Sequence, residues 1–352
     1  MWVGFLAYLG ALAVAPRLGG RIVWGAIVLF VAGFAAAPVL LSHDVYSYVD
    51  YARLGVQHGL DPYVHPPLTA PEDPAYAEVA WTEATSAYGP LFTLATYPLA
   101  WLPVASAVAV LKAVAALAVL GIALIASRLA AARGIDPLRA AAFLALNPLV
   151  LVHVVGGAHN DGLTMLLAML AVAALLSGRE RSGGAALVAA VATKASAAFL
   201  IPFALLGSTK RLRLVTGALA AAVAIAVAAY LAFGWDWLNG LGLAGENQDR
   251  TSYMSIPITA ARLTGLDPDA VRLAAAILFA ATVAYLLAWT WRGGDWIRAA
   301  AWTALALLLA TSWLLPWYLI WVLPLAAISR DRPLQLLTLA LTAYQLGARI
   351  PL

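Results

Sequence analysis

The chain has 352 residues, of which 64% are hydrophobic and only 11% are charged. Soluble domains carry about 25% charged residues, so this composition excludes a water-soluble globule. The absence of cysteine excludes a secreted disulfide scaffold. The length allows roughly ten membrane-spanning helices of about 20 residues each. The net charge of +4 is compatible with basic cytoplasmic loops and by itself does not indicate nucleic-acid binding.

The apolar segments are long, rich in Ala and Leu and without strict alternation, which favours helices over a transmembrane barrel. We predict an all-α polytopic membrane protein with about 10–11 spans, forming a single transmembrane domain over residues 1–352. The spans are expected at residues 2–15, 22–41, 104–126, 140–156, 162–177, 214–233, 270–291, 299–312, 317–329 and 334–350. A signal peptide is the alternative for residues 1–15.

Two apolar segments are too irregular to be simple spans. Residues 87–103 are interrupted by three prolines, and residues 184–207 carry Lys194 at their centre. We predict that the second segment is a re-entrant pair of half-helices with Lys194 near its tip. Irregular backbone at that depth is tolerated only against protein or a wet cavity.

The predicted spans separate the charged residues by sign. One side holds 14 of the 21 Lys and Arg but only four of the 17 acidic residues, and by the positive-inside rule it is cytoplasmic. Its basic residues are Arg17, Arg21, Arg128, Arg133, Arg139, Arg179, Arg181, Lys210, Arg211, Arg213, Arg292, Arg298, Arg330 and Arg332. The outer side has two long loops, residues 42–103 and 234–269, and all five histidines. We therefore expect the functional site on the outer side.

The first outer loop begins with a helical pattern that starts near Ser42, a possible N-cap, and stops at Gly59. Its valines share one face, and Asp44, Ser47, Tyr48 and Tyr51 share another. This pattern predicts a short amphipathic helix lying in the outer membrane interface.

Asp44 is the candidate general base in this helix. A helix N-terminus helps a carboxylate to stay ionised, and an ionised carboxylate can accept a proton from an approaching hydroxyl. Helix capping is the alternative role for Asp44. For Asp50 we expect an ion pair with Arg53, three residues further on.

A second polar constellation, His159-Asn160-Asp161, follows the glycines Gly156 and Gly157 at the outer end of a predicted span. Polar residues so close to hydrocarbon are costly and usually face a cavity. These residues can bind sugar hydroxyls, or Asp161 can act as the base in place of Asp44. The alternative is helix capping by Asn160 or Asp161. No residue spacing indicates a metal site.

Lys194 is the strongest buried-charge signal. A lone lysine in an apolar segment is expected to reach the interface, pair with an acid such as Asp161 or Asp44, or hold an anion such as a lipid-linked phosphate. Arg250 and Arg262, in the second outer loop, are further candidates for phosphate contacts. Trp235, Trp237, Trp313, Trp317 and Trp321 are expected mainly in the interfacial belt, with one or two stacking on a sugar or a polyprenyl chain.

Five motifs in order carry a family resemblance: His43-Asp44-Val-Tyr-Ser-Tyr48, Gly59-Leu-Asp-Pro-Tyr63, Tyr88-Gly-Pro-Leu91, Asn147-Pro148-Leu149 and Gly157-Ala-His-Asn-Asp161. They resemble the polyprenol-phosphate-mannose-dependent α-1,6-mannosyltransferases of actinobacteria, integral-membrane enzymes of the GT-C superfamily. The resemblance covers residues 40–210 well and the C-terminal helices only in general character.

The resemblance implies a GT-C-like fold and an inverting transfer of mannose from polyprenyl-phosphate-mannose to a mannan or glycolipid acceptor, outside the cytoplasm, without cofactor or metal. Asp44 matches the position of the catalytic aspartate. Together with the residue patterns, it makes Lys194, Arg250 and Arg262 the expected phosphate ligands. The expected sugar-binding residues are His43, Tyr48, Tyr88, His159, Asn160 and Asp161. A transporter or flippase of a lipid-linked sugar is the alternative function.

Overall fold

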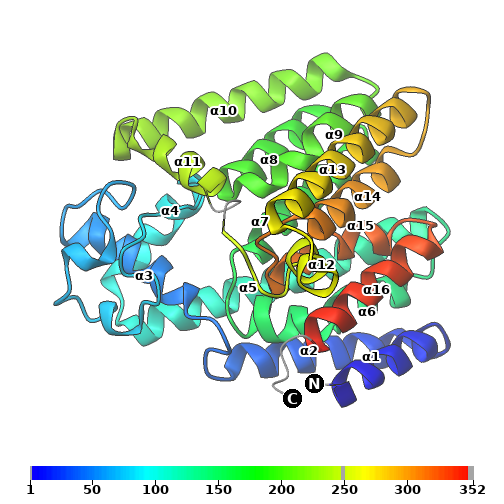
Figure 1. The fold of residues 1–352 in the computed structure, drawn as a ribbon, viewed down its shortest axis with the longest axis horizontal. Coiled ribbons are helices and arrows are strands. Elements are labelled where there is room, and N and C mark those ends of the chain that lie inside the picture. Colours follow the sequence, from blue (N-terminus) through cyan, green and yellow to red (C-terminus); the bar gives the residue numbers. More distant parts are fainter. Residues whose placement is uncertain (1, 247–249, 348–352) are drawn as a thin grey trace.

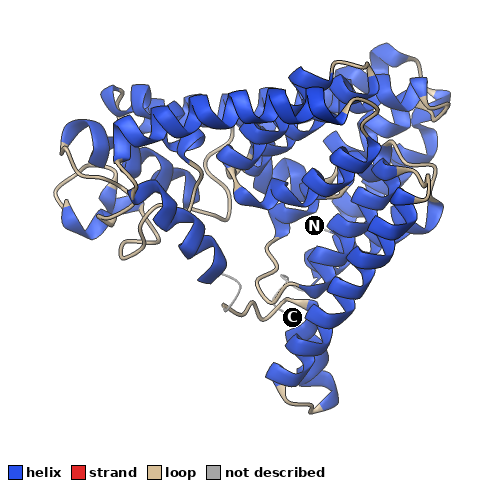
Figure 2. Ribbon diagram, turned by 90° about the horizontal axis from the view of Figure 1, so that it is seen from above, coloured by secondary structure: helices blue, strands red, loops and turns tan. Residues whose placement is uncertain are grey.

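The computed structural model describes residues 2–246 and 250–347, and all regular secondary structure in these ranges is helical (Figures 1 and 2). The α-helices are α1 (Trp2–Val14), α2 (Gly20–Ala36), α3 (Asp44–Gln57), α4 (Pro90–Thr96), α5 (Val104–Ala132), α6 (Pro137–Ala145), α7 (Asp161–Leu176), α8 (Glu180–Thr193), α9 (Ile201–Gly207), α10 (Arg211–Phe233), α11 (Asn239–Glu246), α12 (Ile256–Thr264), α13 (Pro268–Trp291), α14 (Trp296–Ala310), α15 (Leu323–Ala327) and α16 (Arg332–Gly347). Short helical turns are η1 (Ala15–Arg17), η2 (Pro67–Thr69), η3 (Tyr76–Glu78), η4 (Tyr97–Trp101), η5 (Val150–Val155), η6 (Ala195–Leu200), η7 (Asp236–Leu238) and η8 (Pro316–Trp321).

Three helices of the described residues, α5, α10 and α13, are long and apolar enough to cross a membrane. Half of the most apolar stretch of α5 is buried inside the protein, whereas that of α13 is almost wholly exposed. Leu273, Ile277 and Leu278 of α13 are each at least 60% exposed. Because a soluble protein rarely exposes so large a continuous apolar face, these helices make the chain a membrane protein.

The buried core lies where α5, α6 and α7 meet α14, η8 and α15. Residues 140–145 of α6 are all buried, and four of them are alanines, whose small side chains let neighbouring helices approach closely. In Figure 1 the segment between α2 and α5, with α3 and α4, forms a lobe at one side of this bundle. The lobe corresponds to the first predicted outer loop.

Two of the predicted spans are interrupted. The span expected at 140–156 consists of α6 and the wide turn η5, separated at Asn147-Pro148. The span expected at 317–329 consists of η8 and α15, which meet at Val322. In the first case Pro148 lacks an N–H and disfavours helical geometry at Asn147. Asn147 compensates by accepting a hydrogen bond from the backbone N–H of Leu149 at 3.0 Å.

The half-helix pair predicted around Lys194 is present. Lys194 is extended, with φ −156° and ψ 126°, and separates α8 from η6 and α9. The hydroxyl of Ser208, just after α9, donates to Glu180 at the start of α8 at 2.8 Å. The chain therefore returns along η6 and α9 to the end from which α8 began, and Lys194 lies at the turn.

Helix α3 differs from the interfacial helix predicted from its sequence. Nine of its residues are buried, including Ser47, Tyr48 and Tyr51 on the expected polar face. The prediction of a one-sided helix was wrong because α3 packs inside the lobe against η4, α4 and α5. Its N-cap is His43, and Ser42 instead accepts a hydrogen bond from the backbone N–H of Asp44 at 3.4 Å.

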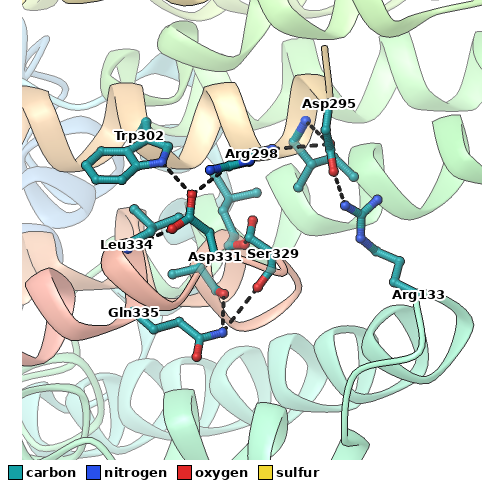
Figure 3. Close-up of polar contacts among 11 residues, drawn as sticks. Arg133, Asp295, Arg298, Trp302, Ser329, Asp331, Leu334 and Gln335 are labelled. Carbon is teal, nitrogen blue, oxygen red and sulfur yellow. Dashed lines mark hydrogen bonds and ion pairs between the residues drawn. The ribbon is translucent and has the colours of Figure 1, made fainter. Parts of the chain in front are cut away.

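A polar network joins the helix ends on the predicted cytoplasmic side (Figure 3). Asp331 accepts hydrogen bonds from Arg298 at 2.6 Å and from the Trp302 indole at 2.8 Å, and Asp295 pairs with Arg133 (Figure 3). Burial raises the pKa of Asp331, but its hydrogen bonds outweigh that effect and hold the pKa below its ordinary value. The network fixes the ends of α5, α14 and α16 to one another.

Candidate active site

A cavity of about 430 Å³ opens between the lobe and the bundle. It is bordered by α3, the turn at Lys194, α11 and the segment from Trp313 to Trp321. Its lining residues are Asp44, Ser47, Tyr51, Trp81, Ala84, Thr85, Ala87, Tyr88, Lys194, Ala195, Ser196, Leu241, Leu243, Gly245, Arg250, Trp313, Leu315, Trp317, Tyr318 and Trp321. Residues from the whole length of the chain therefore meet at one site.

Asp44 lies at the first turn of α3 and borders this cavity. Its Oδ1 accepts a hydrogen bond from the indole N–H of Trp81 at 3.1 Å, and its Oδ2 lies 3.6 Å from Nδ1 of His159. Its side chain is 16% exposed. Burial raises the pKa of Asp44, and the Trp81 hydrogen bond and the positive charge of Lys194 partly counteract that rise.

The glycine motif before α7 brings His159 to Asp44. The backbone N–H of Leu40, just before α3, donates to the carbonyl of Gly156 at 3.3 Å. Gly156 has no room for a side chain, because an added Cβ would lie 2.4 Å from the carbonyl oxygen of Val152. Ala158 then takes a positive φ of 55°, which costs a non-glycine residue of order 1–3 kcal/mol. This strained turn directs the His159 side chain toward Asp44.

His159 is completely enclosed by protein. Its ring stacks on Trp317 with a centroid distance of 3.7 Å and an interplanar angle of 17°. Neither ring nitrogen has a hydrogen-bond partner among the described residues. The stacking therefore fixes the plane of the ring, while Nδ1 faces the Asp44 carboxylate.

Lys194 forms an ion pair with Asp161 at 2.7 Å. The other carboxylate oxygen of Asp161 accepts a hydrogen bond from the Trp321 indole at 2.7 Å, and the Asp161 side chain is 0% exposed. The Lys194 side chain is 18% exposed and borders the cavity. Of the alternatives for Lys194, pairing with Asp161 is therefore observed, and the ammonium group still faces the open space.

The Tyr88-Gly89-Pro90 motif packs the lobe against this turn. The backbone N–H of Gly89 donates to the carbonyl of Thr193 at 3.1 Å. A Cβ on Gly89 would lie 2.0 Å from the carbonyl oxygen of Ala192, so the contact requires glycine. This close approach joins the lobe to the turn at Lys194, and both Tyr88 and Lys194 line the cavity.

Aromatic residues form part of the cavity wall. Trp317 and Trp321 are only 8% and 7% exposed and line the cavity, whereas Trp235 is 67% exposed. Tyr318 stacks on Trp321 at 4.2 Å, and Lys194 lies 5.4 Å from the centroid of the Tyr318 ring. The expected stacking role for one or two tryptophans fits this wall better.

Two aromatic residues of the site were missed by the sequence analysis, Trp81 and Tyr318. Trp81 stands in an irregular, polar segment of the lobe, 37 positions from the carboxylate that it contacts. Tyr318 stands in an apolar run among interfacial candidates. No local spacing in the sequence distinguishes either residue.

The remaining predicted site residues lie at different distances from the cavity. Tyr88 and Arg250 border it, and the Arg250 guanidinium lies 5.2 Å from the ring centroid of Trp81. Tyr48 and Asn160 are buried and do not line it. His43 turns away, with Nδ1 2.9 Å from the Glu78 carbonyl. Arg262 does not line the cavity either, because its guanidinium lies over the Tyr253 ring at 3.4 Å.

The expected ion pair between Asp50 and Arg53 does not form. Arg53 instead donates to Asp73 at 2.7 Å and to the Ala100 carbonyl at 3.1 Å. Burial raises the pKa of Asp73, but its hydrogen bonds from Arg53, the Ala75 backbone and His58 outweigh that effect and lower the pKa. Asp50 is 1% exposed without a hydrogen-bond partner, and burial raises its pKa to about 7. The i, i+3 spacing was overridden by a tertiary contact.

Residues 2–246 and 250–347 contain no group of three or more His, Asp or Glu side chains arranged to hold a metal ion. The charged groups that line the cavity are the Asp44 carboxylate, the Lys194 ammonium and the Arg250 guanidinium. This set can accept a proton at Asp44 and attract an anion at Lys194 and Arg250.

Comparison with known proteins identifies the family. Residues 1–210 match the family model described as alpha-(1->6)-mannopyranosyltransferase, N-terminal domain. The chain is 30% identical to alpha-(1->6)-mannopyranosyltransferase A of Mycobacterium tuberculosis, over 93% of this chain and 70% of that protein. The chain belongs to the alpha-(1->6)-mannopyranosyltransferase family.

This membership makes the protein a glycosyltransferase and supports mannosyl transfer as its activity. Alpha-(1->6)-mannopyranosyltransferase A of Corynebacterium glutamicum is 31% identical over 48% of this chain and 35% of that protein. No solved structure matches the chain at a significant level. The resemblance inferred from the five motifs is confirmed, and the alternative of a transporter or flippase is set aside.

Proposed function

We propose that the protein transfers a mannosyl residue from polyprenyl-phosphate-mannose to an α-1,6-mannan or glycolipid acceptor, with inversion at the anomeric carbon. The observation that carries the proposal is that the Asp44 carboxylate and the Lys194 ammonium border the same cavity in a membrane protein. A base and an anion-binding cation are the two groups that such a displacement needs.

Asp44 is the better of the two candidate bases. Asp161 is 0% exposed, and its two carboxylate oxygens are occupied by Lys194 and Trp321. Asp44 is 16% exposed and has one oxygen, Oδ2, without a close hydrogen bond. The acceptor hydroxyl gives its proton to this oxygen while its own oxygen bonds to the anomeric carbon. The bond from that carbon to the phosphate oxygen breaks, and the electron pair leaves with the phosphate.

Lys194 stabilises this leaving phosphate. Its ammonium group has three N–H donors, and one of them is used by Asp161. The other two are available to a phosphate in the cavity, where low solvent exposure strengthens the attraction. Arg250 also borders the cavity and adds a second positive charge. The aromatic wall provides faces for a sugar ring or an isoprenoid chain.

The charge distribution supports a proposed membrane placement. Arg133 and Arg298, shown in Figure 3, belong to the basic residues that the positive-inside rule assigns to the cytoplasm. We place the lobe and the cavity on the extracytoplasmic side and the shorter apolar helices in the bilayer with α5, α10 and α13, as a single multi-pass GT-C-like domain. Residues 42–103 and 234–269 are its two outer segments.

Reconstitution tests the proposal directly. Purified protein in detergent or nanodiscs is incubated with polyprenyl-phosphate-mannose and a short α-1,6-mannoside, and the product is analysed for linkage and anomeric configuration. We expect an α-1,6-linked product without nucleotide sugar. Transfer from GDP-mannose alone, or no transfer from any polyprenyl-phosphate sugar, would contradict the proposed donor.

A further inference from the structure

Two serine hydroxyls at the cavity are unusual for this chain. Buried hydroxyls on its helices regularly donate to the carbonyl four residues earlier, which is their ordinary solution when no other partner exists. The residues that do so include Thr164, Thr193, Thr290, Ser329, Thr338 and Thr342. Ser47 and Ser196 have no hydrogen-bond partner among the described residues, and both border the cavity.

Neither serine hydroxyl donates to the backbone carbonyls behind it, although a carbonyl that accepts one N–H can accept a second hydrogen bond. The carbonyl of His43, four residues before Ser47, accepts the N–H of Tyr46 at 3.0 Å. The carbonyl of Thr193, three residues before Ser196, accepts the N–H of Gly89 at 3.1 Å. A buried hydroxyl without a partner costs free energy, and functional sites are where such groups are left for a ligand.

The positions of the two serines relate them to the reacting groups. Ser47 lies one helical turn after Asp44 on α3, and both border the cavity. Ser196 lies two residues after Lys194, at the turn where the half-helices meet. In the proposed reaction Lys194 holds the phosphate of the donor, and the anomeric carbon is attacked from the side of Asp44. The donor sugar then lies between α3 and the turn at Lys194.

We propose that Ser47 and Ser196 form the specificity subsite for the donor sugar and read its ring hydroxyl groups. This inference rests on the proposed function. A hydroxyl that meets a sugar hydroxyl discriminates against sugars that lack it, because the partner is then left buried and unpaired. The two serines act on the choice of sugar, whereas Asp44 and Lys194 act on the displacement itself.

Deoxy donors test this subsite. Wild-type protein, Ser47→Ala and Ser196→Ala are assayed with polyprenyl-phosphate-mannose and its 2-, 3-, 4- and 6-deoxy analogues, and kcat/KM is compared. Each alanine variant is expected to lose about threefold to tenfold with the natural donor. With one particular deoxy analogue, the variant and the wild type are expected to be equal, because the hydrogen bond is already absent.

The control is Thr303→Val, which removes a buried unpartnered hydroxyl of α14 that does not border the cavity. This variant is expected to treat all donors as the wild type does. An equal loss with every donor would mean a structural role for the serines and overturn the inference. Selectivity toward deoxy acceptors in place of deoxy donors would overturn it as well. A wild type that transfers no sugar contradicts the proposed function, a separate result.

Discussion

The ammonium group of Lys194 lies 2.7 Å from the carboxylate of Asp161, at a turn between two half-helices. This pair holds the second polar constellation against the tip of the half-helix pair and leaves Asp161 without solvent exposure. It also makes the two acidic candidates unequal, since Asp161 is paired and enclosed and Asp44 borders the cavity. The following predictions use this difference.

Asp44→Asn and Asp161→Asn are expected to fail in different ways. Asp44→Asn removes the general base and should lower kcat by about 10²- to 10⁴-fold while the protein unfolds at the same temperature. Asp161→Asn removes one partner of a buried ion pair and should destabilise the protein by about 3–5 kcal/mol. Mannosyl transfer and thermal unfolding in detergent measure both. Near-normal transfer by Asp44→Asn would exclude it as the base.

A double substitution separates the two roles of Lys194. Lys194→Met alone should lose stability, because it leaves the Asp161 charge buried and unpaired. Lys194→Met combined with Asp161→Asn should regain most of that stability but should still bind the polyprenyl-phosphate donor weakly. Donor titration and thermal unfolding of the two variants and the wild type measure this. Recovery of donor affinity in the double variant would rule out a phosphate contact by Lys194.

His159 is expected to orient Asp44 and to favour its ionised form. Nδ1 of His159 lies 3.6 Å from the Asp44 carboxylate. The amide nitrogen of an Asn side chain can take the place of Nδ1, so His159→Asn should preserve activity better than His159→Gln. Removal of this neighbouring ring nitrogen in His159→Ala should raise the pKa of Asp44 slightly, so the acidic limb of the kcat/KM profile should move to higher pH by only a fraction of a unit. Equal pH profiles for the Ala, Asn and Gln variants would show that His159 acts only through packing.

Asp50 should make the stability of the lobe depend on pH. Its carboxyl faces Asp73, His58 and Arg53, and burial raises its pKa from 3.8 to about 7. Because the folded state favours the protonated form, stability is full below pH 3.8 and is lost as the pH rises toward 7. The loss is at most about 4 kcal/mol, since one pKa unit corresponds to about 1.4 kcal/mol.

Asp50→Asn should therefore unfold at a higher temperature than the wild type at pH 8, and the advantage should shrink toward pH 5. Glu72→Gln, at a carboxylate that is 71% exposed, is the matched control and should show no such trend. Thermal unfolding of the three proteins across this pH range is the measurement. A wild type that is more stable than Asp50→Asn at pH 8 would show that Asp50 is ionised and paired.

The positions of most helices followed from the sequence alone. Long Ala/Leu-rich segments, prolines and glycines determine where helices form and stop, and the lone Lys194 in an apolar segment indicated the half-helix pair, because these are local effects of backbone geometry and solvation. The five motifs also indicated the family, and they contain the acidic residues and several of the glycines of the candidate site. Asp44 and Asp161 could be named as candidates from these motifs, and Lys194 from its position in an apolar segment.

Partners and burial were decided by the tertiary structure. Arg53 pairs with Asp73 instead of Asp50, α3 is enclosed instead of one-sided, and Trp317, Tyr318 and Trp321 line the cavity. Each outcome depends on contacts between segments far apart in the chain, such as Trp81 with Asp44 and Trp321 with Asp161. Helical spacing constrains neighbours three or four residues apart, and it contains no information on which distant segment supplies the other half of a hydrogen bond.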